Sequence, residues 1–405
     1  MADTIVAPTL FQRSWNTSAK SLVGLQLSLP GRVFVTRATT ASADALPAAE
    51  VVITSNSSAL LDLISVHVVN STFTPTIQNW KMQVGPADPV LKLSVRDPSS
   101  RVEGSLLVHI LLSGPVRSVS TSAQTILGEG TLLSNHQTEA IDIAAYGNEN
   151  VWIESGEPIA LKGVTLNAYG SGNIQFTAPS LTLSKTLDLN VFGIGSVVME
   201  AAEAAVGSIE STVGGQGSIF VHGKYAVADM ASHILGSGSI NYYPSGTCGK
   251  SKVDIIGVGN INAGSWVCQR AHASVLGSGK AIVQVADALD VSGIGRGHIE
   301  YFNATPASLP GGKTGILAGP KVEVAVANTF QAFAPLPTPR REAIFVSVGP
   351  ANSGWFQPSS VSSNMNAVAS HPEMLAGLCA LALLSVLVAV VRRRQPQRYR
   401  YSSIS

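Results

Sequence analysis

Short runs of alternating apolar and polar residues, separated by glycines, fill the middle of the chain. Glycine pairs of the form Gly-X-Gly recur there at steps of 18 to 23 residues. The pairs begin at Gly170, Gly193, Gly215, Gly236, Gly257, Gly277 and Gly295. A drifting period near 21 residues is typical of a solenoid in which each repeat makes one coil and the turns absorb insertions. The pattern predicts a parallel β-solenoid of about seven coils.

Two columns of residues keep their chemistry from repeat to repeat. The fourth residue after the first glycine is apolar: Ile174, Val197, Ile219, Ile240, Ile261, Ala281 and Ile299. The third residue is polar: Asn173, Ser196, Ser218, Ser239, Asn260, Lys280 and His298. A second apolar column stands two residues before the glycine: Val191, Val213, Ile234, Ile255 and Val275. This alternation predicts a strand with one face inside the coil and the other in solvent.

The glycine pairs also resemble a phosphate-binding turn, especially at 293–297. That chemistry requires a helix immediately after the glycines, whose N-terminal amides face the anion. A strand pattern follows each pair instead, so we interpret the glycines as corners. Glycine at a corner lets the backbone take positive φ or pack closely on the coil below. We expect no cofactor.

Composition supports a mainly β fold and argues against one class of partner. The chain has 38 glycines and only 13% charged residues, and the strand formers lie in short runs between glycines. The last 14 residues hold five arginines and no acid, so residues 1–391 carry 21 basic and 25 acidic groups. A nucleic-acid-binding domain needs a basic stripe on its folded part. We expect no nucleic-acid partner.

An uncharged stretch near the C-terminus predicts a membrane span. Residues 374–391 contain no charge, and three arginines follow them. A helix of this length measures about 27 Å, enough to cross a thin hydrocarbon core. Arginines beside a span favour the cytoplasmic side. We therefore expect a single-pass protein bound to the bilayer through one helix, with a cytoplasmic tail at 392–405 and an extracellular or lumenal solenoid.

The N-terminus does not fit that orientation. Residues 1–20 lack the basic and apolar regions of a signal peptide. Either the start is wrongly assigned, or the protein is tail-anchored with the solenoid in the cytosol. Sequons at Asn56, Asn70 and Asn303 are candidate glycosylation sites and favour the first alternative.

The cysteines also bear on the compartment. Cys248 lies 12 residues after Gly236, and Cys268 lies 11 residues after Gly257. Adjacent coils would bring these near-equivalent positions within reach of a disulfide. The alternative is two free thiols that coincide by accident. We favour the bridge, and with it an oxidising compartment.

The repeats resemble the putative auto-transporter adhesin head GIN domain family. The resemblance rests on YGSGNIQF (169–176), LGSGSINYY (235–243), LGSGKAIVQV (276–285) and GRGHIEYF (295–302). The stretches LSLPGRVFVTR (27–37), VVITSNSSALLDLISVHVVNSTFT (51–74) and SLLVHILLSGPVRSVS (105–120) look like that family's opening strands. The family name implies adhesion. The Asp that often follows GSG in the family is replaced here, which removes an acidic ladder for metal, and a closing glycine is missing after Tyr301.

We find no catalytic or metal-binding constellation. Counted forward from each glycine pair, the acids of the repeats fall at scattered offsets, which argues against the paired carboxylates of a polysaccharide-processing enzyme. His222, His233, His272 and His298 also occupy different offsets, without a cysteine or second histidine at ligand spacing. Five aromatic residues of the last coils could stack on sugars or proteins, or simply fill coil corners: Tyr242, Tyr243, Trp266, Tyr301 and Phe302.

These expectations divide the chain into six parts. They are an unstructured N-terminus or wrongly assigned start (1–20), a β-rich N-terminal part and solenoid cap (21–125), the solenoid (126–303), a Pro/Ser-rich stalk (304–373), the membrane helix (374–391) and the basic tail (392–405). We expect a membrane-anchored surface protein of adhesin type, not an enzyme, with a glycan or a surface protein as candidate ligand. The alternatives are a scaffold without an external ligand and, third, a polysaccharide-processing enzyme.

Overall fold

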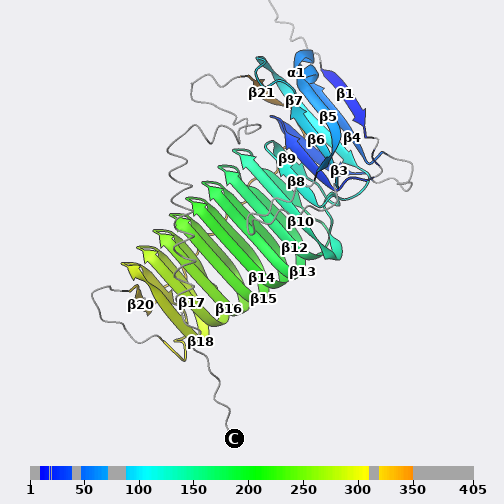
Figure 1. Cartoon of the computed structure of the whole chain (residues 1–405). Helices are drawn as coiled ribbons and strands as arrows, with labels where there is room; N and C mark the ends of the chain where they lie inside the picture. Colours follow the sequence, from blue (N-terminus) through cyan, green and yellow to red (C-terminus); the bar gives the residue numbers. More distant parts are fainter. Residues whose placement is uncertain are drawn as a thin grey trace, which may run out of the picture. The chain divides into compact units, whose positions relative to one another are not determined.

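The computed structural model describes residues 10–17, 19, 21–38, 47–71, 88–309 and 319–349. These residues form a mainly β structure with one short helix, α1 (Ser58–Leu63), among them (Figure 1). Six long parallel strands each make one coil of a solenoid: β13 (Ile174–Gly193), β14 (Ser196–Gly215), β15 (Ser218–Gly236), β16 (Ser239–Gly257), β17 (Asn260–Gly277) and β18 (Lys280–Gly295). The register pairs each corner glycine with the next, so the prediction of one coil per repeat is confirmed.

Each coil has three sides. Buried and outward residues alternate along each side, and the alternation is interrupted where the chain turns from one side to the next. In β13 the inward residues are Ile174, Phe176, Ala178, Leu181, Leu183, Leu187, Leu189 and Val191. Alternation breaks after Ala178 and after Leu183, where the chain turns to a new side. We call 174–178 side 1, 180–183 side 2 and 187–192 side 3, with the equivalent positions in the other coils. The glycine corner joins side 3 to the side 1 that follows.

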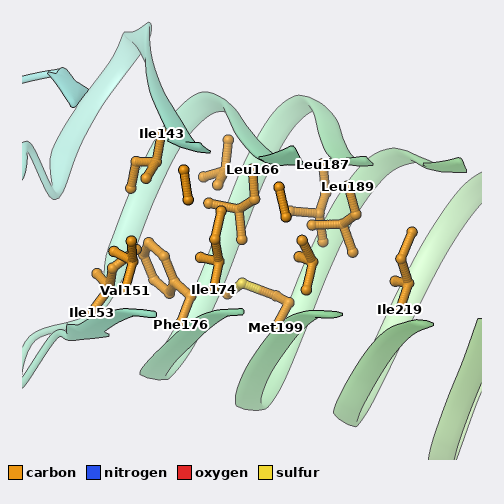
Figure 2. Close-up of a cluster of buried hydrophobic side chains, with 14 of the residues drawn as sticks. Ile143, Val151, Ile153, Leu166, Ile174, Phe176, Leu187, Leu189, Met199 and Ile219 are labelled. Atoms are coloured by element: carbon orange, nitrogen blue, oxygen red, sulfur yellow. The ribbon is translucent and has the colours of Figure 1, made fainter. Parts of the chain in front are cut away.

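Both predicted apolar columns point into the core. Every member of the column Ile174 to Ile299 is fully buried, and the column that begins at Val191 is at most 2% exposed. Figure 2 shows Ile174 and Ile219 of the first column among the buried side chains inside successive coils. The polar column that begins at Asn173 is half-exposed for most of its length, as predicted for the outer face.

The corners explain why the glycines recur. The first glycines of the pairs have φ between +123° and +141°, where a Cβ is strained. The carbonyl of Gly215 accepts hydrogen bonds from two amides of the next corner, Ser237 N at 2.9 Å and Gly238 N at 3.1 Å. A Cβ on Gly236 would overlap that carbonyl oxygen. Consecutive corners thus stack backbone on backbone.

The solenoid has about nine turns, more than the seven predicted. Gly147 stacks below Gly170 in the same way, but it is followed by Asn148 and Glu149 and lacks the second glycine. A search for Gly-X-Gly therefore misses this corner. The strands of these first coils are β8 (Ser118–Thr121), β9 (Gln124–Leu127), β10 (Asn135–Gly147), β11 (Val151–Glu154) and β12 (Ile159–Gly170).

The N-terminal part continues two sides of the solenoid and then changes to antiparallel pairing. Side 3 extends through β8 to β2 (Gly24–Ser28) and β6 (Asp88–Val95), and side 1 through β9 to β3 (Arg32–Arg37) and β7 (Val102–Leu112), all parallel. The antiparallel strands are β1 (Phe11–Asn16), β4 (Ala49–Ser55), β5 (Ile64–Ser71) and β21 (Ile344–Val348). One continuous core fills this part and the coils.

Part of the predicted stalk lies on the solenoid. After β19 (His298–Tyr301), β20 (Lys321–Val324) adds a further parallel strand. Residues 325–343, which we call the strap, then cross side 1 of successive coils back toward the N-terminal part, where β21 pairs with β7. The proline-rich composition does give an extended segment, but over 325–343 this segment is docked and is not a free spacer.

The predicted fold class is corrected in one respect. Residues 374–391 lie outside the described residues. In the part of the chain that the structure describes, no helix is long and apolar enough to cross a membrane. The prediction of a C-terminal membrane helix, and the single-pass localisation derived from it, are therefore not supported.

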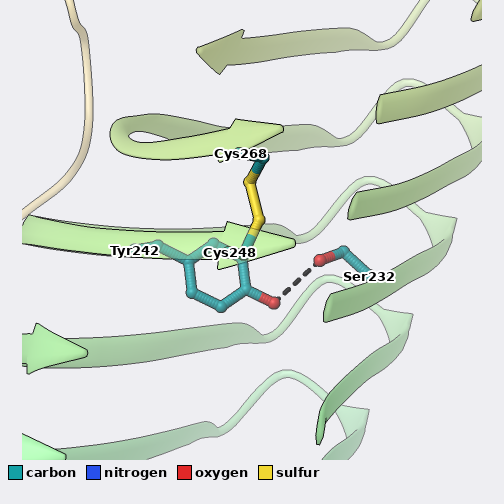
Figure 3. The surroundings of a disulfide bond; sticks show 4 residues. All are labelled: Ser232, Tyr242, Cys248 and Cys268. Carbon is teal, nitrogen blue, oxygen red and sulfur yellow. Dashed lines mark hydrogen bonds between the residues drawn. A yellow bond between two sulfur atoms is a disulfide. The ribbon is translucent and has the colours of Figure 1, made fainter. Parts of the chain in front are cut away.

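Cys248 and Cys268 form a disulfide between adjacent coils (Figure 3). Their Cα atoms are 4.3 Å apart, and both side chains are buried in the column that Val227 and Val285 occupy in the neighbouring coils. Beside the bridge, the Tyr242 hydroxyl lies 2.7 Å from Ser232 Oγ. The bond thus replaces a Val–Val contact of the core.

We predict that Gly236→Ala destabilises the fold by several kcal/mol, because the new Cβ meets backbone and the φ of +131° is strained. Gly114→Ala is the control, since a Cβ there meets nothing within 4 Å. Urea unfolding followed by circular dichroism measures both. Equal effects at the two positions would contradict the role of the stacked corners.

We predict that Cys248→Val/Cys268→Val keeps the fold, because valine fills the same column elsewhere. Loss of the cross-link should lower the free energy of unfolding by about 3 kcal/mol, as for loops of similar length. The comparison is thermal unfolding of this variant against the parent protein with and without reductant. A parent that is insensitive to reductant would contradict a stabilising bridge.

Candidate functional site

Side 3 presents three outward columns, which are found by counting back from the corner glycine. The column five residues before it holds Asp142, Thr165, Asp188, Glu210, Ala231, Lys252, His272 and Asp290. The column three residues before it runs from Ala144 through Asn167, Asn190, Thr212, His233 and Asp254 to Ser292. The column directly before it begins with Tyr146, Tyr169 and Phe192.

Carboxylates gather in the first of these columns. Asp188 and Glu210 occupy paired positions on adjacent coils. Burial, with help from the charge of Glu210, raises the pKa of Asp188 to about 6. Burial likewise raises the pKa of Asp142 to about 7, although a hydrogen bond from Asn167 opposes the rise. Asp188 Oδ1 is buried without a hydrogen-bond partner among the described residues, which further favours its protonated form.

Counting forward from the glycine pairs does not reveal these carboxylates. Asp142, Asp188 and Glu210 each lie five residues before a glycine, but Asp188 and Glu210 differ in their distance from the preceding one. Insertions at the corners within a coil shift every forward offset. Counting back along side 3 crosses no such corner, so it recovers the true register.

Side-chain amides form the second column of the site. Asn190 Nδ2 donates to Asn167 Oδ1 at 3.0 Å, and Asn167 Nδ2 donates to Asp142 Oδ1 at 3.3 Å. The amides are thus oriented in one direction along the stack. Such ladders hold polar groups in fixed positions, spaced by about 4.8 Å, the distance between strands.

Three aromatic rings form the third column. The rings of Tyr146 and Tyr169 stack with centroids 5.0 Å apart, and those of Tyr169 and Phe192 with centroids 5.7 Å apart. Because the rings cover each other's faces, their edges and the two hydroxyls point outward. Burial raises the pKa of both tyrosines, so these hydroxyls remain neutral donors. The carboxylates, amides and rings of 142–210 make up what we call the polar patch.

Further along side 3 the charges are paired. His233 Nδ1 and Lys252 Nζ lie 3.1 Å and 2.5 Å from Asp254 Oδ2. Burial alone would raise the pKa of Asp254, but the bonds from His233 and Lys252 outweigh it and lower the pKa to about 2. This part of side 3 therefore offers a network of ion pairs around Asp254.

Exposed apolar side chains, which we call the apolar ridge, lie along the stacked glycine corners beside the patch. Its members flank the corner glycines and are exposed: Ile194, Leu235, Val258, Leu276 and Ile294. Ile194 is 65% exposed and Val258 56%. Exposed apolar side chains that gather along one edge mark contact surfaces in many proteins.

The structure decides between the two roles that the sequence left open for the central aromatic residues. Tyr242 and Trp266 are fully buried inside the coils, where their rings lie 4.8 Å apart. Tyr243 lies on side 1 beneath the strap. Tyr301 and Phe302 are half-buried. Only the alternative, in which aromatic residues fill the coil, agrees with Tyr242 and Trp266.

One histidine lies close to two carboxylates, on β19 and β20. Ligand atoms of His298, Glu300 and Glu323 lie within 4.8 Å of one another. Lys280 Nζ is 2.8 Å from Glu300, and Lys321 Nζ is 2.5 Å from Glu323. These ammonium groups already neutralise the carboxylates, so the arrangement fits an ion-pair network. The expectation of no metal stays a prediction.

The candidate sequons differ in their surroundings. Asn56, Asn70 on β5 and Asn303 after β19 are all exposed, and Asn56 Oδ1 also accepts a hydrogen bond of 2.6 Å from Ser105 N. Glycosylation of the three asparagines stays a prediction.

The site is a surface and not a pocket. A small cavity beside Thr131, Ile153 and Phe176 measures about 20 Å³. That volume holds roughly one water molecule.

The stacked corners and three-sided coils define a parallel β-solenoid. Residues 199–305 match the model of the family described as "Putative auto-transporter adhesin, head GIN domain", which confirms the resemblance seen in the repeats. The match begins in β14 and ends just after β19. No curated protein matches the chain.

Several solved structures are similar to this chain. A putative adhesin from Parabacteroides distasonis is 14% identical, with 72% of this chain and 97% of that chain covered and a TM-score of 0.44. A putative lipid binding protein from the same organism is 14% identical, with 78% and 96% covered and a TM-score of 0.35. A putative adhesin from Parabacteroides merdae is 16% identical, with 78% and 96% covered and a TM-score of 0.36.

We predict that the polar patch makes stability depend on pH. A carboxyl group whose pKa is raised on folding stabilises the fold below its unfolded pKa, and this stabilisation is lost as pH rises through the folded value. The free energy of unfolding should therefore fall between pH 4 and about pH 7. Asp142→Asn should reduce the fall by about 1–2 kcal/mol, less than the full shift implies because the side chain is partly exposed.

The control for this prediction is Asp229→Asn, on an exposed position of β15. Urea unfolding at pH 4, 5.5 and 7 gives the three free energies for each protein. A pH profile of Asp142→Asn identical to that of the parent would contradict the raised pKa.

Proposed function

We propose that this protein is a non-enzymatic binding protein of adhesin type, and that its polar patch binds a glycan. The observation that carries the proposal is the alignment of carboxylates, amides and ring edges in three neighbouring columns of side 3. Acceptors and donors at fixed spacing match the repeated hydroxyl groups of a sugar chain. The match of residues 199–305 to an adhesin family supports the same class.

The arrangement of the carboxylates favours binding over hydrolysis. Glycosidases place their two carboxyl groups on either side of the scissile bond, one as acid and the other as base or nucleophile. Asp188 and Glu210 instead lie in one column of one flat side, so both would approach a sugar from the same direction. The buried disulfide of β16 and β17 fits an oxidising compartment, where an adhesin would act.

The apolar ridge supports a second candidate function, a scaffold without an external ligand. Ile194, Leu235, Val258, Leu276 and Ile294 would be covered if two copies packed corner to corner. In that case the protein should self-associate, and a charge at Val258 should abolish the association. Sedimentation of the parent and of Val258→Glu tests this candidate separately from the glycan.

We predict that the full chain captures glycans on an array and that Asn190→Ala and Glu210→Gln each weaken the capture about tenfold. Loss of one hydrogen bond in a binding site costs about 1–1.5 kcal/mol, which corresponds to that factor. Binding should strengthen between pH 5 and 7, as Asp188 and Asp142 become charged acceptors.

Lys224→Ala, on the exposed side 2, serves as the matched control and should bind like the parent. The captured glycan is then incubated with the protein and assayed for new reducing ends. Release of reducing ends would contradict the non-enzymatic assignment, and equal binding by all four proteins would contradict the location of the site.

A further inference from the structure

Side 1 carries apolar residues on its outer face. The residues that follow the inward column of side 1 point outward, and Val198, Phe220 and Ile282 are among them. All three are at most 4% exposed. The strap accounts for the burial of Phe220, because the ring of Phe333 packs on it with centroids 5.3 Å apart.

The strap anchors itself with every third residue. The ring of Phe330 stacks on Tyr243 at 4.9 Å, Phe333 packs against Phe220, and Leu336 packs on the cluster of Phe34, Ile126 and Trp152. Three residues make one turn of a polyproline II helix, so residues at this spacing point to the same side. Pro335, Pro337 and Pro339 lie within or just beyond this stretch and favour that conformation.

Side chains of the solenoid also bind the backbone of the strap. Gln331 N donates to Asn241 Oδ1 at 2.9 Å, Phe333 N to the Tyr243 hydroxyl at 2.8 Å, and Leu336 N to Gln175 Oε1 at 3.0 Å. In return, Trp152 Nε1 donates to Leu336 O at 3.3 Å. These bonds require an extended backbone but no particular side chain at Gln331, so other sequences could satisfy them.

We propose that side 1 is a binding groove for an extended, proline-containing segment of another protein, and that the strap occupies this groove in cis. The groove binds bulky apolar side chains at every third position of the segment, and it accepts hydrogen bonds from backbone amides of the same segment. Aromatic-lined grooves that bind polyproline II segments are a recurring mode of peptide recognition. This groove lies on side 1 and is independent of the glycan site on side 3.

Much of the strap faces solvent. Phe330 is 36% exposed even when it is stacked, and most strap residues between 329 and 341 are exposed. An attached segment competes at an effective concentration in the millimolar range. A partner can therefore bind only to those molecules in which the strap has left the groove. Weakening the strap increases this fraction and should raise the apparent affinity for the partner.

The test uses a fluorescent peptide with the sequence of residues 326–343, which excludes β21, and the full chain as the binding protein. In Phe330→Ala/Phe333→Ala the strap is weakened, but every residue of the groove is retained. Anisotropy titration should show the peptide binding to this variant at least tenfold more tightly than to the parent. Val326→Ala is the matched control, because Val326 is fully exposed in the strap, and it should bind like the parent.

Two further proteins test whether the peptide binds in the groove and whether a folding defect explains the result. Tyr243→Ala in the weakened background removes a groove ring and a backbone acceptor and should lower the affinity at least tenfold. A parent chain with a protease site inserted after Val326 and then cut should also bind the peptide more tightly than the uncut chain. A peptide in which Phe330 and Phe333 are alanine should bind none of these proteins.

Three results would overturn the proposal. They are no peptide binding to either the weakened or the cut chain, equal binding of the alanine peptide, and unchanged affinity after Tyr243→Ala. Dimerisation of the weakened variant without peptide binding would also overturn it, because the groove would then accept only the strap of a second copy.

Discussion

The stacking of one corner glycine on the next fixes the geometry of the whole solenoid. Each carbonyl from Gly147 to Gly257 accepts two amides of the following corner, and a Cβ on the next stacked glycine would overlap that oxygen. Backbone contact of this kind leaves one register between neighbouring coils. This register also produces the columns of side chains inside and outside the coils. Side chains alternate between the two faces along each strand, so a fixed register at the corner fixes which residues stack along the rest of each side.

The same register explains why like residues meet in ladders. Inside the coils it stacks Ile on Val and places Cys248 over Cys268 in a column of valines. Outside, it places Asn167 next to Asn190 and Asp188 next to Glu210. Apolar ladders gain from this proximity, whereas Asp142 and Asp188 lose solvation, which raises their pKa values. The stacking that stabilises the core thus also places carboxyl groups with raised pKa values on the surface.

Sequence alone predicts the features that depend on local periodicity. The inward columns and the coil per repeat follow from the spacing of Gly236 and Ile240, and the structure confirms them. The polar patch was missed because its register requires counting back from the glycine, and Gly147 was missed because its corner lacks a second glycine. Whether Trp266 lies inside or outside the coil could not be predicted, since a residue two corners away from its glycine has no fixed offset. The docking of Leu336 on Trp152 joins residues 184 apart in sequence, which no local pattern reveals.

The outward residues decide which side of the solenoid is covered. Phe220 and Ile282 point outward from side 1. Burying an aromatic or aliphatic side chain contributes about 1.5–3 kcal/mol to the stability of the fold. A chain with such a side needs a cover, and the strap supplies one from its own C-terminal region. Side 3 carries Asn190 and Glu210 at the corresponding outward positions, and covering them would require a partner for each polar group. The chain therefore covers with its own strap the side that gains from apolar burial, and side 3 keeps polar groups whose hydrogen bonds an external ligand can complete.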